Sequence, residues 1–257
     1  MKRSRFPLVM TAGILVFFYL PVVILVANSF NAAKYSSRWQ GFTLDWYAKL
    51  FHSPEIWQSV RATLIIALSS TVVSLVLGTA AAFALHRYAG SRLQRVHYML
   101  IYTPHVVPEI LMGISLLMAF VAAGVGLGLV TIFLAHVTFC VSYVAMVVLA
   151  RLQDFDFSLI EAAQDLGAGW WQSTRKVLLP LLLPGLAAGG LIAFTLSVDD
   201  FVITFFVAGP GSTTLPLRIY SMIKYGNPPM INALSTLLLA VTFAAVIASQ
   251  KLARLKR

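Results

Sequence analysis

The chain has 257 residues, of which 59% are hydrophobic and only 11% are charged. A soluble domain carries about 25% charged residues, so we expect lipid rather than water to solvate most of this surface. The single cysteine, Cys140, excludes an internal disulfide framework. The net charge of +10 is scattered between apolar runs, which favours a membrane surface over nucleic acid as the partner.

Apolar runs that can cross a bilayer, which takes about 20 residues, recur along the chain. The first follows the basic lead Lys2-Arg3-Ser4-Arg5 and is longer than a signal-peptide core, so we expect it to be retained. The uncharged stretch from Ile110 to Ala150 is too long for one span, and the glycine-rich segment 124–128 divides it. The predicted spans are residues 8–28, 62–85, 98–123, 129–149, 186–207 and 230–250.

The distribution of Lys and Arg predicts the orientation of these spans. Thirteen basic residues fall on the side that holds both termini, and six fall on the other side. Because cytoplasmic flanks are enriched in Lys and Arg, we expect both termini in the cytoplasm. The sequence therefore predicts an all-α integral membrane protein with six transmembrane helices, organised as a single domain over residues 1–257.

The connection between the fourth and fifth predicted spans, about residues 150–184, is predicted to contain regular secondary structure. Ser158 is followed three residues later by Glu161, which is the capping-box pattern at the start of a short helix over 159–165. Gly167 is suited to the left-handed conformation that ends such a helix.

A second short helix is expected over Trp170–Leu178, ending before Pro180. Three pieces of the connection follow one spacing: Glu161-Ala162-Ala163, then Gly167, then Val177-x-Leu179-Pro180. This spacing resembles the EAA loop of the membrane subunits of bacterial ABC importers, with Val177 in place of the more common isoleucine. An amphipathic helix lying on the bilayer surface is the alternative reading.

That resemblance implies a type I ABC importer permease fold whose coupling helix sits in a groove of a cytoplasmic ATPase. The residues it assigns to ATPase coupling are Ser158, Glu161, Ala162, Ala163, Asp165, Leu166, Gly167, Ala168, Leu179 and Pro180. We therefore expect this loop to be the mechanical input to the transporter.

The resemblance extends along the chain and is closest to the spermidine/putrescine permeases, of the second-permease type. The segments that carry it are Leu134–Cys140, Ala193–Asp200, Gly209–Pro216 and Asn232–Leu234. It implies a polyamine cargo, the bacterial inner membrane, an ATPase dimer that binds ATP and Mg, a second homologous permease and a periplasmic binding protein. No cofactor is expected in this chain.

Three carboxylates fall inside predicted spans, where an ionisable group normally faces a cavity or a partner: Asp199, Asp200 and Glu109. Adjacent helical residues point about 100° apart, so Asp199 and Asp200 can face one path only if the helix is unwound there. Interhelical hydrogen bonding is the alternative role for this pair. For Glu109, which follows Pro104 and Pro108, the first turn of a restarted helix is favoured over cargo contact.

Tyr220 and Tyr225 are candidates for cation–π contact with cargo, worth about 0.5–2 kcal/mol each, or for anchoring at the membrane interface. His136 and Cys140 stand one helical turn apart, but two ligands make a poor metal site, and no metal is expected.

The motif G-x-x-x-x-G-K-[ST] does not occur, so we expect no enzyme activity here and ATP hydrolysis by a partner. The alternatives are a permease for another small solute of the same superfamily, an autonomous secondary transporter and a membrane-bound enzyme scaffold. The EAA-like loop argues against the last two, since neither needs an ATPase docking helix.

Overall fold

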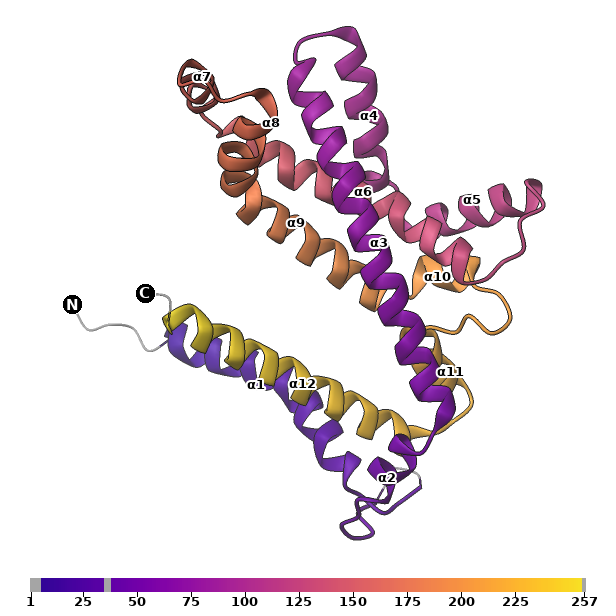
Figure 1. The fold of residues 1–257 in the computed structure, drawn as a ribbon. Coiled ribbons are helices and arrows are strands. Elements are labelled where there is room, and N and C mark those ends of the chain that lie inside the picture. Colours follow the sequence, from indigo (N-terminus) through magenta and orange to yellow (C-terminus); the bar gives the residue numbers. More distant parts are fainter. Residues whose placement is uncertain (1–5, 35–37, 256–257) are drawn as a thin grey trace. The chain divides into compact units, whose positions relative to one another are not determined.

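The computed structural model describes residues 6–34 and 38–255, and every regular element within them is a helix (Figure 1). The basic lead at residues 2–5 lies outside the described residues. The chain divides into a terminal unit, Met1–Trp57 with Arg218–Arg257, and a central unit, Gln58–Leu217.

The terminal unit contains α1 (Phe6–Ser29), α2 (Asp45–Phe51) and α12 (Pro228–Leu255), and α12 packs against both α1 and α2. The buried amide of Asn31 organises the loop between α1 and α2. Its Oδ1 accepts hydrogen bonds from the amides of Ala33 (3.1 Å) and Gln40 (2.9 Å). The Trp46 indole donates to the Asn31 carbonyl at 2.8 Å, so Asn31 holds the described residues of this loop together.

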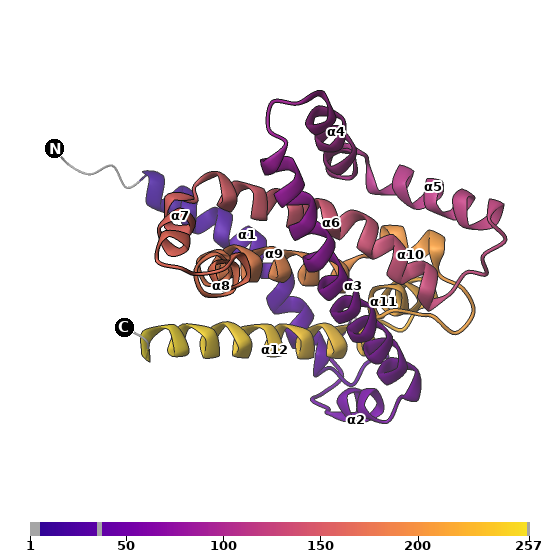
Figure 2. The same cartoon turned by 45° about the horizontal axis from the view of Figure 1, so that its top comes forward.

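The central unit is built around α6. Its helices are most of α3 (Pro54–Arg87), α4 (Arg92–Val106), α5 (Glu109–Ala122), α6 (Leu129–Gln153), α7 (Ser158–Asp165), α8 (Trp170–Ser173), the π-helical turn η1 (Thr174–Leu178), α9 (Leu179–Asp199) and α10 (Val202–Val207). The helix α11 (Leu215–Lys224) begins in this unit and ends in the terminal unit. Figure 2 shows α5 beside α10, and these two helices pack together.

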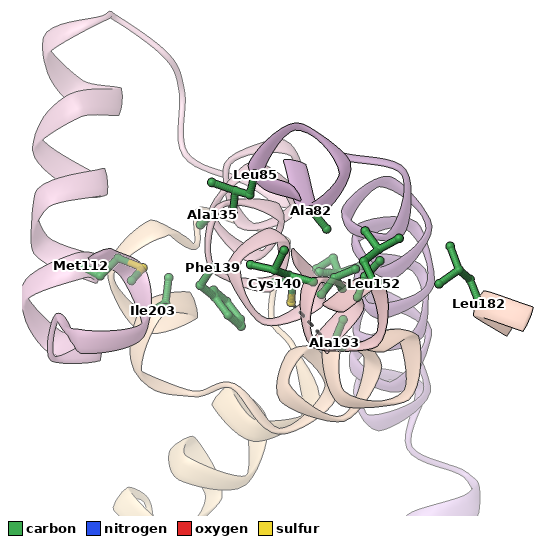
Figure 3. Close-up of a cluster of buried hydrophobic side chains, with 14 of the residues drawn as sticks. Ala82, Leu85, Met112, Ala135, Phe139, Cys140, Leu152, Leu182, Ala193 and Ile203 are labelled. Atoms are coloured by element: carbon green, nitrogen blue, oxygen red, sulfur yellow. Dashed lines mark hydrogen bonds between the residues drawn. The ribbon is translucent and has the colours of Figure 1, made fainter. Parts of the chain in front are cut away.

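Small residues let the helices of the central unit approach closely, as is common between membrane helices. A Cβ at Gly78 of α3 would stand 2.8 Å from the Val144 Cβ of α6. The Cys140 thiol of α6 donates to the Ala193 carbonyl of α9 at 3.5 Å (Figure 3). The core of this unit therefore lies where α6 meets α3 and α9.

Among the described residues, four helical stretches are long and apolar enough to cross a membrane: Phe6–Ser29, Pro54–Arg87, Leu129–Gln153 and Trp170–Asp199. The pair α4 and α5 passes the same test jointly but is bent by 110°, so it is a broken span or a re-entrant loop. The apolar part of α12, Pro228–Ala244, is shorter. The all-helical membrane class is confirmed, whereas six spans and the cytoplasmic termini stay predictions.

The predicted span over 98–123 is interrupted, because the chain breaks between α4 and α5. Val107 is extended, with φ −69° and ψ 128°, as expected for a residue before proline. Pro108 then stands just before the first residue of α5, and Glu109 lies in the first turn. The expected restart is confirmed, one residue later than predicted.

The expected boundary at Pro180 is also wrong, because α8, η1 and α9 form one continuous helical stretch from Trp170. The π-helical turn ends two residues before Pro180 and includes Lys176, whose carbonyl would collide with the proline ring in a regular α-helix. Widening the helix at this point accommodates the ring. The predicted span over 186–207 is interrupted at Asp200 and Phe201.

Candidate functional site

The first candidate site is the segment from α7 to α9. No residue of α7 is buried, although the helix packs against α8 and η1. Just beyond it, the side chain of Leu166 is 89% exposed. Leu179 and Pro180, which the sequence grouped with this segment, lie at the start of α9 instead. The segment therefore presents an open surface with an apolar tip.

The end of α7 follows the sequence prediction. Gly167 has φ +88°, which is the left-handed conformation that glycine adopts at little cost. The Gly167 amide donates to the Gln164 carbonyl at 2.8 Å, and the Ala168 amide donates to the Ala163 carbonyl at 3.0 Å. These two bonds form a Schellman motif, which fixes the direction of the chain after the helix.

The predicted capping box at Ser158 is wrong. Phe157 occupies the cap position in a helical conformation, without a capping side-chain bond, and Ser158 is already the first helical residue. The Ser158 amide donates to Asp156 Oδ1 at 3.0 Å. The pKa of the exposed Asp156 carboxyl is lowered by hydrogen bonds from the Ser158 hydroxyl and amide. Asp156, two residues upstream of Ser158, therefore accepts a hydrogen bond from the first amide of the helix, whereas Ser158 was predicted to be the capping residue.

The second candidate site is a cleft of about 250 Å³ in the central unit. The three carboxylates predicted from the sequence, Glu109, Asp199 and Asp200, all line it. Its other walls come from α4, α5, α6, α9 and α10 and include the aromatic rings of Phe139 and Tyr143. A cleft with three acidic groups in an apolar helical unit is suited to a cationic ligand.

Asp200 is the most enclosed of the three carboxylates, with its side chain 5% exposed. Its Oδ2 accepts from the Thr204 amide (2.8 Å) and the Thr204 hydroxyl (2.6 Å), and its Oδ1 accepts from the Ile203 amide (3.3 Å). These bonds satisfy amides of the first turn of α10. His136 Nε2 of α6 lies 3.2 Å from Asp200 Oδ2, so Asp200 caps α10 and contacts a neighbouring helix.

Asp199 has the opposite setting, because it is the last residue of α9 and its side chain is exposed. A helix carries partial negative charge at its carboxyl end, and the last turn of α9 holds no basic residue. Glu109 and Asp200 instead stand at the amino ends of α5 and α10, where negative charge is stabilised. Asp199 is therefore the carboxylate whose surroundings most favour a cation.

The structure brings the three acids together in one cleft. Tyr220 and Tyr225 belong to the terminal unit and are not among the residues that line the cleft. The sequence-based prediction treats His136 only as a possible metal ligand and does not include its contact with Asp200. Its place in an uncharged apolar run was the available signal, because a polar ring at membrane depth needs a partner.

Residues 74–255 match the family model described as "Binding-protein-dependent transport system inner membrane component". The chain is 42% identical over 245 residues to the spermidine/putrescine transport system permease protein PotC of Escherichia coli K12, covering 95% of this chain and 92% of that protein. It is 41% identical over 248 residues to the putrescine transport system permease protein PotI of the same strain, covering 94% and 88%.

Solved structures show the same fold. A chain of a bacterial ABC transporter involved in alginate import superposes with a TM-score of 0.75 at 16% identity, covering 98% of both chains. A chain of the inward-facing MetNI methionine ABC transporter gives a TM-score of 0.63 at 24% identity, covering 79% of this chain and 97% of that one.

Proposed function

Because the chain belongs to the family of inner membrane components of binding-protein-dependent transport systems, we propose that it is the permease subunit of an ATP-driven importer for a polyamine. The cargo would pass from the periplasm to the cytoplasm. The observation that carries the cargo assignment is the cleft lined by Glu109, Asp199 and Asp200. The names of the two Escherichia coli relatives, which specify spermidine and putrescine, support the same cargo class.

The three carboxylates have different roles in binding a cation. Asp199 contacts an ammonium group of the cargo, helped by the carbonyls at the end of α9. An ammonium ion that leaves water needs such compensation, because an unpaired buried charge is strongly unfavourable. Asp200 and Glu109 hold the starts of α10 and α5 and add negative potential. The rings of Phe139 and Tyr143 contact the methylene chain between the ammonium groups.

ATP hydrolysis by the partner is coupled to transport through the segment around Gly167. The exposed surface of α7 and the Leu166 tip dock on a partner ATPase, which binds ATP and Mg and hydrolyses ATP. The coupling residues are those that the EAA resemblance assigns, with Leu179 and Pro180 acting at the start of α9. The continuous helical stretch from Trp170 to Asp199 would carry a displacement from the docked loop to the cleft.

The complete importer would contain this chain, a second homologous permease, an ATPase dimer and a periplasmic binding protein in the bacterial inner membrane. Six spans with both termini in the cytoplasm place α7 on the ATPase side. In that arrangement the bent pair α4 and α5 and the helix α12 supply the two spans beyond the four long apolar stretches.

The test is transport by the reconstituted complex. Proteoliposomes that hold both permeases and the ATPase, with ATP inside and loaded binding protein outside, are expected to accumulate labelled putrescine or spermidine. Vesicles with a non-hydrolysable ATP analogue are the control. Accumulation by this chain alone, driven by an ion gradient, would favour a secondary transporter. ATP-driven uptake of a different solute, with none of either polyamine, would favour another small-solute permease.

A further inference from the structure

A fully enclosed imidazole, His136 of α6, makes contacts through both ring nitrogens. Its side chain is 1% exposed. Nδ1 lies 2.6 Å from the Ser197 hydroxyl of α9, and Nε2 lies 2.9 Å from the Thr204 hydroxyl of α10. Nε2 is also 3.2 Å from Asp200 Oδ2. One ring therefore joins the two helices on either side of the break at Asp200.

The contacts continue from the ring to α3. The Ser197 hydroxyl lies 3.1 Å from the Ser70 hydroxyl. Ser70, Ser197 and Thr204 are all buried, with exposures of 0%, 3% and 0%. Side chains from four helices of the central unit therefore form one buried hydrogen-bond network. Such a network stabilises the fold only if each of its polar groups has a hydrogen-bond partner.

The hydroxyl groups determine part of the hydrogen-bond pattern around the His136 ring. The Thr204 hydroxyl donates to Asp200 Oδ2, so the Thr204 oxygen is left to accept from His136 Nε2–H. Nδ1 and the Ser197 hydroxyl share the second hydrogen bond of the ring. The Ser70 hydroxyl donates to the Ala67 carbonyl at 3.3 Å and lies within hydrogen-bond distance of the Ser197 hydroxyl, so each polar atom of this group has a partner.

His136 does not line the cleft, but its neighbours do. Phe139, whose ring centroid lies 5.3 Å from that of His136, is a wall residue. Asp200, its partner on the other side, is another. The ring stands directly behind the place where α9 ends and Asp199 faces the cleft.

We propose that His136 is a positioning residue for cargo transfer, a role that rests on the proposed function. It holds the end of α9 and the start of α10 at a fixed separation, so that Asp199 and the final carbonyls of α9 face the ammonium group. It does not touch cargo itself. A displacement of such groups by about 1 Å can reduce a rate on the order of 100-fold.

The experiment compares His136→Phe, which keeps a ring but loses every polar contact, with His136→Gln, which keeps a donor near Thr204 and Asp200. In the complete complex we expect His136→Phe to lower the maximal uptake rate at least tenfold without changing the KM for loaded binding protein. It should also change the preference between diamines of different length. His136→Gln should recover most of the rate. Thr138→Val, at an exposed position of α6, is the matched control and should transport normally.

A second measurement does not depend on transport. Hydrogen exchange at the amides of Ile203 and Thr204 should become faster in His136→Phe, because their acceptor Asp200 loses its support. If His136→Phe does not fold, the same measurements are made on Ser197→Ala, which removes one contact of the ring. Unchanged exchange, rate and diamine preference in a folded variant would overturn the inference. If the wild-type complex imports no polyamine, the proposed function fails, and the exchange result then decides only whether His136 supports the start of α10.

Discussion

Asp199 and Asp200 are consecutive residues, yet the first ends one helix and the second caps the next. Asp199 is the last residue of α9, with an exposed side chain. Asp200 accepts hydrogen bonds from two amides of α10 and lies 3.2 Å from His136 Nε2. Both carboxylates line the cleft, and the break between the helices leaves only Asp200 bonded to the start of α10.

Replacing each aspartate by asparagine should separate these roles. Asp200→Asn weakens charge-assisted bonds of the kind worth about 1.5–3 kcal/mol each, so we expect a lower midpoint of thermal unfolding for the purified complex. Asp199→Asn should leave that midpoint unchanged and reduce polyamine uptake, because under the proposed function the exposed charge contacts cargo. Both variants should still assemble with the ATPase. An equal loss of stability in the two variants would contradict the division.

The EAA-like segment offers a second test at Gly167, whose φ of +88° is unfavourable for other residues. A Cβ there would meet nothing within 4 Å, so Gly167→Arg should insert and fold. The strained backbone, at about 1–2 kcal/mol, and the added bulk should prevent docking and abolish ATP-driven uptake. Gly167→Asn is the control, since Asn tolerates this conformation. Normal uptake by Gly167→Arg would remove the segment from coupling.

Local signals predicted the features that depend on neighbours in the chain. The glycine-rich segment marked the turn before α6, which begins at the predicted residue, Leu129. Gly167 marked the end of α7, and Pro108 marked the restart at Glu109. In each case glycine or proline acts on the adjacent backbone, so the end or start of the helix follows from the local sequence alone.

Features that depend on competing or distant partners could not be predicted in the same way. Ser158 fits a capping box, but Asp156 competes for its amide and shifts the helix start. At the break, Asp200 contacts His136, which is far away in the sequence and comes close only when α6 packs on α9 and α10. The three acids were found because charge inside an apolar run is visible locally, whereas their separate roles are not.

The start of α7 should respond to acid through Asp156. Its pKa lies below the ordinary 3.8 because Ser158 donates to it. A carboxyl with a lowered pKa in the folded state stabilises that state above the ordinary pKa, and the contribution is lost as pH falls through the lowered value. We therefore expect the protection of the Ser158 amide against hydrogen exchange to be constant from neutral pH to about 5 and to fall only below 3.8.

Asp156→Asn should remove this acid dependence, because the amide has no charge to lose. Asp165→Asn, at the other end of α7, is the matched control and should keep it. A loss of protection that begins near neutral pH, or one that persists in Asp156→Asn, would show that another group controls the start of the helix.

The last prediction concerns the contact between two loops of the central unit. Gly209 lies so close to the segment before α6 that an added Cβ would overlap the Leu127 carbonyl. The contact is fixed nearby, since the Thr131 hydroxyl donates to the Val207 carbonyl at 2.7 Å. Backbone atoms on both sides leave no flexible side chain to move, so Gly209→Ala should destabilise the protein by about 1–3 kcal/mol.

Thermal unfolding of the detergent-solubilised protein measures this effect, which corresponds to roughly 2–4 °C per kcal/mol for a chain of this size. Gly126→Ala is the control, because a Cβ there meets nothing within 4 Å and its φ lies outside the left-handed range. We expect a lower midpoint for Gly209→Ala and no change for Gly126→Ala. Equal midpoints would mean that the two loops separate freely, and the close contact at Gly209 would then contribute nothing to stability.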